Sequence, residues 1–350
     1  MKLKNTLKRR KAFTSDISFE DSVFLTWLSY FNYDARCKIS FVPLKDIDDS
    51  ASDFYHDASF PSTAKKVFKT MKKEDKFSSL AIGEYENISD KELQYASCLV
   101  KVTDDFYFFT VRGTDPSVSG WKENFLTGLR VPIQAQKYAF EVLRNLLKKY
   151  PNATFSLGGH SKGGSILLYA YLSLREEEKK RIKKVFLLDS PALSFPMEKT
   201  EEDKKKIIKR IPKSSLFGML FEEHPEEDQV VLCKANTFMQ HNIFLWECDK
   251  QGNNILLPDR DKTSKRLSYA FSHWVNSLDK EDISFFIDTC FERILRHSGL
   301  EDFFSLIYPV RWIRLFNAYI TLEKKDKKRV KRIGKGFLTF YQESKKIKNL

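Results

Sequence analysis

The sequence has no apolar stretch long enough to cross a lipid bilayer. Its longest uncharged, apolar-rich stretches, residues 22–33 and 163–174, are each about a dozen residues long, whereas a spanning helix needs about 20 residues. The first 16 residues are basic, but no apolar segment of the kind found in signal peptides follows them. We therefore expect neither a membrane span nor a secretory signal.

Cysteine, glycine and proline are also scarce. The five cysteines are scattered and form no Cys-x-x-Cys pair, so no disulfide framework or zinc site is indicated, and we expect a cytoplasmic location and no bound metal. Thirteen glycines and eleven prolines are too few for a collagen-like or low-complexity chain. Hydrophobic residues make up 42% of the sequence, including 30 phenylalanines, which is enough for a large folded core.

Positive charge is concentrated at the two ends of the chain. The formal net charge is +13, of which residues 1–11 contribute +6 and residues 323–350 contribute +8, so the remainder carries −1. A nearly neutral body argues against a nucleic-acid-binding groove, and we expect no nucleic-acid partner. Basic ends are instead compatible with peripheral contact to an anionic membrane.

The C-terminal tail has the pattern of a basic amphipathic helix. Apolar side chains recur at helical spacing among its lysines and arginines, at Val330, Ile333, Phe337 and Tyr341. Such a helix lies on a membrane surface or packs on the protein with its basic face in solvent. We favour packing, because Gly334 and Gly336 lower the helix propensity.

Short apolar strands alternate with helices along the middle of the chain. The pattern predicts a helix at 17–33, a loop-rich region to about residue 75, strands at 97–103 and 106–112, a helix at 133–150, a strand at 153–157, a helix at 165–175, strands at 185–188 and 229–234, and helices from about residue 262. This alternation predicts an α/β fold with a mostly parallel central sheet, helices on both of its faces, and a helical C-terminal region.

The domain organisation follows from these elements and from the charge. We expect a basic N-terminal arm at residues 1–16 and an α/β core at residues 17–260. Residues 261–322 are expected to form a helical part of the same domain, and residues 323–350 a basic helical tail.

The segment most informative about chemistry is Gly159-His160-Ser161-Lys162-Gly163, a Gly-x-Ser-x-Gly pattern. A predicted strand leads into it and an apolar helix follows it, which is the setting of a nucleophile elbow. There the serine has a strained backbone, in a turn too tight for neighbouring side chains and close to the positive end of a helix. An ordinary glycine-rich turn is the alternative, and the coincidence of strand, glycines and helix favours the elbow. The G-x-x-x-x-G-K-[ST] pattern of a phosphate-binding loop is absent.

A nucleophilic serine needs a general base, and six histidines are available. In hydrolases with this motif the chain order is serine, acid, histidine, which excludes His56 and His160. We predict His241, because it follows the 229–234 strand, and the sites of open α/β sheets gather where strands end. The other histidines lie in an acidic stretch or in helical segments: His224, His273 and His297.

The predicted acid is Asp189, which directly follows the 185–188 strand at the same sheet edge as Ser161. A turn-forming aspartate before Ser190-Pro191 is the alternative explanation for this residue. Glu222 and Glu223 are the next candidates. The segment 194–228, rich in Lys, Glu and Phe, is expected to form a cap over the site.

An oxyanion intermediate needs backbone N–H donors. One is expected from Lys162, which follows Ser161. The other is expected from Thr114, since the 106–112 strand breaks at Gly113.

Three parts of the sequence together resemble a known family: Val111-Arg-Gly-Thr-Asp with Gly120-Trp-Lys-Glu-Asn-Phe, Gly159-His-Ser-Lys-Gly-Gly, and Met239-Gln-His. They are similar to the Mbeg-like family, a bacterial family of lipase-like α/β-hydrolases of unassigned function that is allied to the class 3 lipases. The likeness runs over most of residues 17–306.

The resemblance implies an α/β-hydrolase fold with Ser161 as nucleophile, Asp189 as acid and His241 as base. It also implies an oxyanion hole at Thr114 and Lys162. The chain departs from the family pattern at three places: Ser190 and Ala192 follow the acid, Asn242-Ile243 follows the base, and Asn124 is the third departure. These departures leave the three catalytic candidates in place and affect the shape of the pocket.

Two functions are therefore considered. The first is a serine hydrolase that cleaves lipid or other acyl esters through an acyl-enzyme, without a metal or organic cofactor, and loses activity below about pH 6–7 because its base must be neutral. The second is a catalytically silent protein of the same fold that binds an anionic membrane or an acidic partner through its basic ends.

Overall fold

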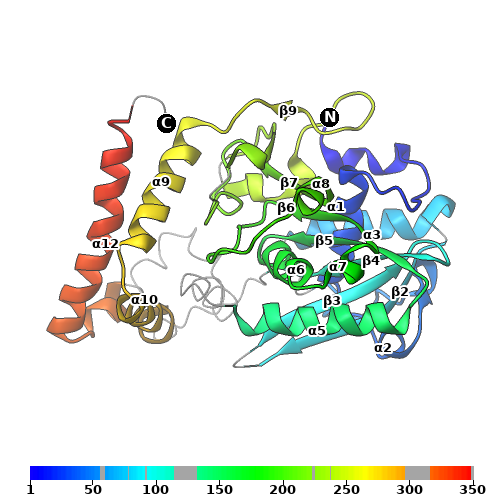
Figure 1. Cartoon of the computed structure of the whole chain (residues 1–350), viewed down its shortest axis with the longest axis horizontal. Coiled ribbons are helices and arrows are strands. Elements are labelled where there is room, and N and C mark those ends of the chain that lie inside the picture. Colours follow the sequence, from blue (N-terminus) through cyan, green and yellow to red (C-terminus); the bar gives the residue numbers. More distant parts are fainter. Residues whose placement is uncertain are drawn as a thin grey trace. The chain divides into compact units, whose positions relative to one another are not determined.

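The computed structural model describes residues 1–55, 60–77, 79–90, 93–113, 132–222, 225–236, 238–295 and 316–347. These residues fall into two compact units. Unit 1 consists of Met1–Gly113 and Gln134–Arg260, and unit 2 takes most of its described residues from Asp261–Leu350. In Figure 1 the strands belong to unit 1, and the helices of unit 2 are coloured yellow to red.

Unit 1 is built on a nine-stranded sheet whose strands lie side by side in chain order, as far as the chain is described. The strands are β1 (Val42–Pro43), β2 (Ala81–Ser89), β3 (Gln94–Lys101), β4 (Phe106–Val111), β5 (Thr154–His160), β6 (Ile182–Leu188), β7 (Ile207–Pro212), β8 (Gln229–Val231) and β9 (Leu256–Leu257).

The sheet is mixed rather than mostly parallel, which corrects the prediction. Strands β4 to β8 run parallel to one another, whereas β1 to β4 pair antiparallel, as do β8 and β9. The connection between β3 and β4 covers only residues 102–105. That is too short for the crossover that parallel strands require, so only an antiparallel pair can form there.

Most of the predicted elements are present. The 97–103 and 106–112 strands correspond to β3 and β4, and the 153–157 strand to β5, which continues to His160. The predicted helices correspond to α1 (Phe19–Trp27) with the following 3-10 turn Leu28–Tyr30, α5 (Gln134–Lys149) and α6 (Lys162–Leu172). Unit 1 also contains the short helices α2 (Arg36–Ile39) and α7 (Glu176–Lys179).

Two regions differ from the prediction. The segment 194–228 does not form a cap over its whole length, because it contains α8 (Glu201–Lys206) and β7, which pairs in parallel with β6 and β8 inside the sheet. The buried Lys209 interrupts the apolar run by which an internal parallel strand is recognised. The region expected to be loop-rich contains α3 (Pro61–Lys73), whose apolar residues Ala64, Val67, Phe68 and Met71 are buried.

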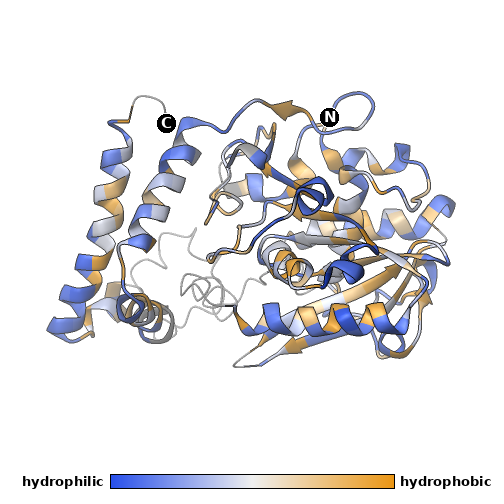
Figure 2. Cartoon of the chain, viewed as in Figure 1, coloured by the Kyte–Doolittle hydropathy of each residue, from blue (hydrophilic) through white to orange (hydrophobic). Residues whose placement is uncertain are grey.

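Helices cover both faces of the central strands. Successive residues of a strand point to opposite faces. A side chain at Gly158 of β5 would meet Thr26 of α1, whereas one at Gly159 would meet Gly163 of α6, so α1 and α6 lie on opposite faces. α5 packs beside α6, and Figure 2 shows hydrophobic and hydrophilic residues alternating along α5, as expected for a helix with one buried side.

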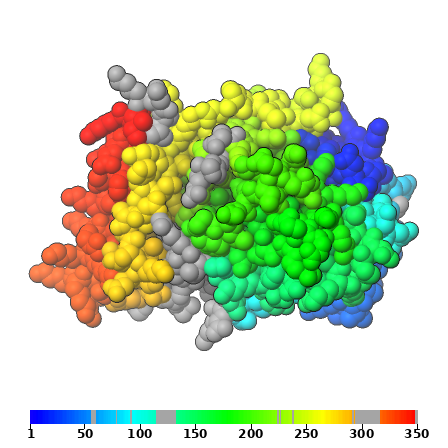
Figure 3. All heavy atoms as spheres, in the orientation of Figure 1, coloured from blue at the N-terminus to red at the C-terminus, as the bar shows by residue number. Residues whose placement is uncertain are grey.

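The basic N-terminal segment packs on unit 1 instead of extending from it as an arm. Leu3 and Leu7 are fully buried. The N-terminal ammonium donates a hydrogen bond to the carbonyl oxygen of Cys248, at 2.8 Å, and lies 3.3 Å from the carboxylate of Glu247. Figure 3 shows this segment, in blue, in contact with the rest of unit 1.

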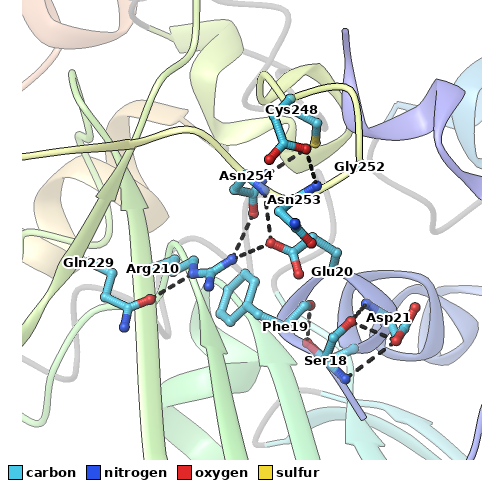
Figure 4. Close-up of polar contacts among 12 residues, drawn as sticks. Ser18, Phe19, Glu20, Asp21, Arg210, Gln229, Cys248, Gly252, Asn253 and Asn254 are labelled. Atoms are coloured by element: carbon cyan, nitrogen blue, oxygen red, sulfur yellow. Dashed lines mark hydrogen bonds and ion pairs between the residues drawn. The ribbon is translucent and has the colours of Figure 1, made fainter.

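A buried ion pair fixes the start of α1 against β7. The Arg210 guanidinium donates to Glu20 at 2.6 Å and stacks 4.3 Å from the ring centroid of Phe19, while Glu20 also accepts the backbone N–H of Asn254 at 2.9 Å. Figure 4 shows Arg210 between Glu20, Asn254 and Gln229. With its first turn held in this way, α1 presents its last residues to the carboxyl ends of β4 and β5.

The described part of unit 2 is helical. It contains α9 (Lys262–Asn276), α10 (Lys280–Ile287), a π-helical stretch (Asp288–Leu295) and α12 (Lys324–Ser344). The indole N–H of Trp274 on α9 donates to the carbonyl oxygen of Ile333 at 2.8 Å, and Arg329 and Arg332 of α12 pair with Asp282 of α10. The C-terminal helix therefore packs within unit 2. None of the described helices has both the length and the apolar character that crossing a membrane requires.

Candidate functional site

Ser161 stands at a sharp turn between β5 and α6. Its backbone angles are φ 54° and ψ −132°, a conformation that non-glycine residues rarely adopt. The turn is tight: a side chain at Gly159 would lie 2.5 Å from the backbone of Gly163, and one at Gly163 would lie 2.3 Å from the carbonyl oxygen of Val111. Only glycine fits at both positions, so the Gly-x-Ser-x-Gly pattern has a steric cause.

Asp189 lies at the end of the neighbouring strand β6. The backbone N–H of Ser161 donates to the carbonyl oxygen of Leu188 at 3.0 Å, so the two strand ends are directly adjacent. Asp189 is 1% exposed and has a positive φ of 43°. Its Oδ1 accepts hydrogen bonds from the Ser215 hydroxyl, at 2.6 Å, and from the backbone N–H of Gly218, at 3.1 Å. These donors fix the carboxylate and leave Oδ2 for another partner.

That other partner is His241, on the 3-10 turn Phe238–His241 that follows β8. Its Nδ1 lies 2.7 Å from Asp189 Oδ2. A carboxylate only accepts, so Nδ1 carries the hydrogen and Nε2 is the nitrogen left to accept a proton. The imidazole lies between the rings of His160 and Phe217, with centroids 4.4 and 4.3 Å away.

The structure also brings His241 close to the turn that carries Ser161. His160, the residue before Ser161, lies 3.1 Å from the carbonyl oxygen of His241 through its Nε2. Within the described residues no direct hydrogen bond joins the Ser161 hydroxyl to His241. Ser161 is partly exposed, whereas His160 is buried.

His160 and Tyr30 are polar residues of this site that the sequence interpretation missed. The Tyr30 hydroxyl lies 2.9 Å from His160 Nδ1 and accepts the N–H of Gly113 at 3.1 Å. Burial, and secondarily the neighbouring His241, lower the pKa of His160 well below its ordinary value, so this imidazole is neutral at physiological pH. The Gly-x-Ser-x-Gly pattern contains His160, but no local signal points to Tyr30.

The remaining predicted residues are placed as follows. Lys162 is the first residue of α6, and its ammonium donates to Gln94 at 2.9 Å. Glu222 pairs with Lys209, and His273 lies in α9 of unit 2. The other candidates lie outside the described residues: Thr114, His56, His224, His297 and Glu223.

Neither the described side chains nor their spacing indicates a metal centre. No group of three or more histidine, cysteine, aspartate or glutamate residues in the described part of the chain could hold a metal ion. Chemically, the arrangement offers a hydroxyl at the positive end of a helix and, hydrogen-bonded to the residue before that hydroxyl, a histidine whose Nδ1–H is held by a carboxylate. Such an imidazole can take up a proton at Nε2 and return it.

Two solved lipase structures are similar to this chain at low sequence identity. The crystal structure of M37 lipase is similar at 12% identity over 58% of this chain and 70% of that chain, with a TM-score of 0.36. Lip2 lipase from Yarrowia lipolytica is similar at 12% identity over 45% of this chain and 66% of that chain, with a TM-score of 0.28. No curated protein matches the sequence.

The Mbeg1-like family profile matches residues 71–292, which include β2 to β9, the turn at Ser161, Asp189 and His241. This match covers more than half of the chain and confirms the family to which the sequence motifs pointed. The chain belongs to the Mbeg1-like family.

Proposed function

We propose that this protein is a serine hydrolase of the α/β-hydrolase fold that cleaves acyl esters. One observation carries the proposal: the His241 imidazole, held by the buried Asp189, lies against the residue that precedes Ser161, and Ser161 has a strained backbone at the start of α6. These features support a nucleophile elbow at Ser161 and a Ser161–His241–Asp189 triad.

In the proposed reaction His241 Nε2 accepts the Ser161 hydroxyl proton as Oγ forms a bond to the ester carbonyl carbon. The carbonyl electrons move to oxygen, and the backbone N–H groups of Lys162 and Thr114 stabilise that negative charge. The tetrahedral intermediate then expels the alcohol, which takes the proton from the imidazolium. Asp189 keeps Nδ1 protonated and stabilises the imidazolium in between.

The second half of the reaction repeats the same steps with water. His241 takes a proton from water while the oxygen attacks the acyl-enzyme carbonyl. Collapse of the second intermediate releases the carboxylic acid and returns the proton to Ser161. All proton transfers use side chains of this chain, and no cofactor is needed.

The proposal is tested by hydrolysis of p-nitrophenyl esters of increasing acyl length. Ser161→Ala is expected to lower the rate by on the order of 10³-fold or more with the best ester. The matched control is Ser173→Ala, which changes the serine at the other end of α6. If Ser161→Ala and Ser173→Ala hydrolyse every ester at the same rate, the proposed function is wrong.

We also propose peripheral contact with anionic membranes through α12. Lys328, Lys331 and Lys335 are exposed along this helix, at helical spacing. Replacing all three with Gln should weaken sedimentation with phosphatidylserine vesicles. Replacing the exposed Lys137, Lys148 and Lys180 of unit 1 should change it less. Equal binding by both triple variants would contradict this contact.

A further inference from the structure

A buried chain of hydrogen bonds passes beside the candidate triad. It runs from the backbone N–H of Gly113 to Tyr30 Oη at 3.1 Å, from Tyr30 Oη to His160 Nδ1 at 2.9 Å, and from His160 Nε2 to the carbonyl oxygen of His241 at 3.1 Å. Tyr30 and His160 are 0% and 1% exposed. Water therefore does not compete for the hydrogen bonds of these two side chains.

The chemistry of the end groups fixes the direction of each hydrogen bond. The carbonyl oxygen of His241 can only accept, so His160 Nε2 carries a hydrogen. Because His160 is neutral, its Nδ1 has no hydrogen and accepts from the Tyr30 hydroxyl. The Tyr30 oxygen then accepts from the backbone N–H of Gly113, which can only donate. One arrangement of hydrogens satisfies all three contacts.

The series of hydrogen bonds ends at two backbone groups, each of which belongs to or adjoins a residue of the proposed site. One end is His241, the proposed base. The other end is Gly113, the last described residue before Thr114, the proposed oxyanion donor. A side chain at Gly113 would lie 2.5 Å from Tyr30 Oη, 2.6 Å from the carbonyl oxygen of His160 and 3.2 Å from Ser161 Cβ, so Gly113 packs closely against Tyr30 and the turn that carries Ser161.

Aromatic packing holds the two connecting side chains. The Trp27 ring stacks on Tyr30 with centroids 4.5 Å apart and lies 5.3 Å from the His160 ring. Trp27 and Tyr30 come from α1 and the 3-10 turn that follows it, whose start is anchored by Glu20 and Arg210. A rigid element from the beginning of the chain thus reaches the site.

We propose that Tyr30 and His160 are positioning residues of the hydrolytic site, which hold the backbones of His241 and Gly113 at a fixed separation next to the turn that carries Ser161. This inference rests on the proposed function, since it assigns a role within that site.

The location of His241 explains why such positioning matters. Its backbone belongs to a short 3-10 turn, and a site on a loop is held less precisely than one on a strand or helix. Displacing a reacting group by about 1 Å costs on the order of 10²-fold in rate. Asp189 restrains the imidazole, and His160 restrains the backbone that carries it.

The main test compares two buried tyrosines that differ in position by three residues. Tyr30→Phe removes the hydroxyl that joins His160 to Gly113. Tyr33→Phe is the matched control, because the buried Tyr33 hydroxyl also makes one short hydrogen bond, to the carbonyl oxygen of Leu28 at 2.7 Å, but none to His160. We expect similar losses in Tm, with kcat for the best ester lowered about 10- to 100-fold only in Tyr30→Phe and KM little changed in both.

Substitutions at His160 provide a second comparison. Gln can still donate to the His241 carbonyl, whereas Phe fills the space and donates nothing. We expect His160→Gln to retain more kcat than His160→Phe. Equal kcat in Tyr30→Phe and Tyr33→Phe would overturn the positioning role, whether or not the His160 variants fold.

The outcomes separate this inference from the proposed function. If Ser161→Ala still hydrolyses the esters, the proposed function fails. If Ser161→Ala is inactive and Tyr30→Phe matches Tyr33→Phe, only the positioning role fails.

The geometry is also tested without turnover by NMR of the protein with ¹⁵N-labelled histidine, in which the His160 signals are those lost in His160→Gln. We expect the neutral Nε2–H tautomer at pH 7, and an Nδ1–H tautomer would contradict the inference.

Discussion

Two buried carboxylates of unit 1 lie beside the two strands that flank β7, and they have opposite kinds of partner. Asp189, after β6, bonds to an imidazole, a hydroxyl and a backbone N–H. Asp228, before β8, lies 3.1 Å from the ammonium of Lys209 on β7, which also pairs with Glu222. The side chains of Lys209 and Asp228 are 7% and 3% exposed.

The difference shows that the partner of a buried carboxylate, more than its burial, decides what it can do. In the Lys209 cluster one ammonium faces two carboxylates, and removing it takes away the cation that both carboxylates share. Asp189 accepts from a hydroxyl and a backbone N–H, and its imidazole partner, whose backbone is hydrogen-bonded to the residue before Ser161, has a second nitrogen that the carboxylate does not engage. The first arrangement stabilises a fold, and the second can move a proton.

The largest expected effect compares the same substitution at both carboxylates. In Asp189→Asn the amide would donate to His241 Nδ1 and so favour the wrong tautomer, and we expect ester hydrolysis to fall by on the order of 10³-fold. Asp228→Asn should hydrolyse esters at close to the wild-type rate. Steady-state kinetics of the two variants measure the contrast, and equal losses would show that the two carboxylates do not differ in role.

A smaller effect, on the free energy of unfolding, is expected from removing the ammonium of Lys209 that Glu222 and Asp228 share. Lys209→Met leaves Glu222 and Asp228 without their common partner, and we expect the free energy of unfolding to drop by about 3 kcal/mol. Urea denaturation measures this change. The kcat of the folded variant should stay near the wild-type value, and a large loss of kcat at unchanged stability would place Lys209 in the reaction.

The smallest effect, counted per pH unit, is a pH dependence of stability. Burial, with a contribution from Glu222 and against the opposing effect of Lys209, raises the pKa of Asp228 to about 7. Between its unfolded value of about 4 and pH 7 the native state binds more protons, so this group's stabilisation is present at low pH and is lost as the pH rises through about 7.

The Asn side chain of Asp228→Asn cannot titrate, so this variant should lack the pH-dependent part of the unfolding free energy that comes from Asp228. The difference in unfolding free energy between wild type and Asp228→Asn should therefore change between pH 4 and 7, by at most about 1.4 kcal/mol per pH unit. Chemical denaturation across this range measures it. A pH-independent difference would mean that Asp228 is ionised throughout the range.

The sequence predicts those parts of the fold and site that are determined locally. The turn at Ser161 follows from Gly159 and Gly163 with a strand before and a helix after, and the structure has that turn. Asp189 and His241 were predicted from chain order and strand ends, and they form a hydrogen bond. Their catalytic roles stay predictions.

The features that sequence did not predict depend on distant pairings. The contact between Tyr30 and His160 joins residues 130 positions apart, and neither residue shows by its type that it meets the other. Strand β7 was missed because Lys209 is charged, and its burial depends on carboxylates contributed by a later segment. Likewise, the basic composition of residues 1–16 predicts an arm, whereas the burial of Leu3 and Leu7 depends on the rest of unit 1.

The most direct test of the central claim is the site of covalent labelling by a fluorophosphonate, which reacts with activated serines. Wild-type protein and the Asp228→Asn and Ser173→Ala variants should each gain one adduct, mapped by peptide mass spectrometry to Ser161, whereas Ser161→Ala should gain none. Folded wild-type protein that gains no adduct, or an adduct mapped to a different serine, would contradict the account.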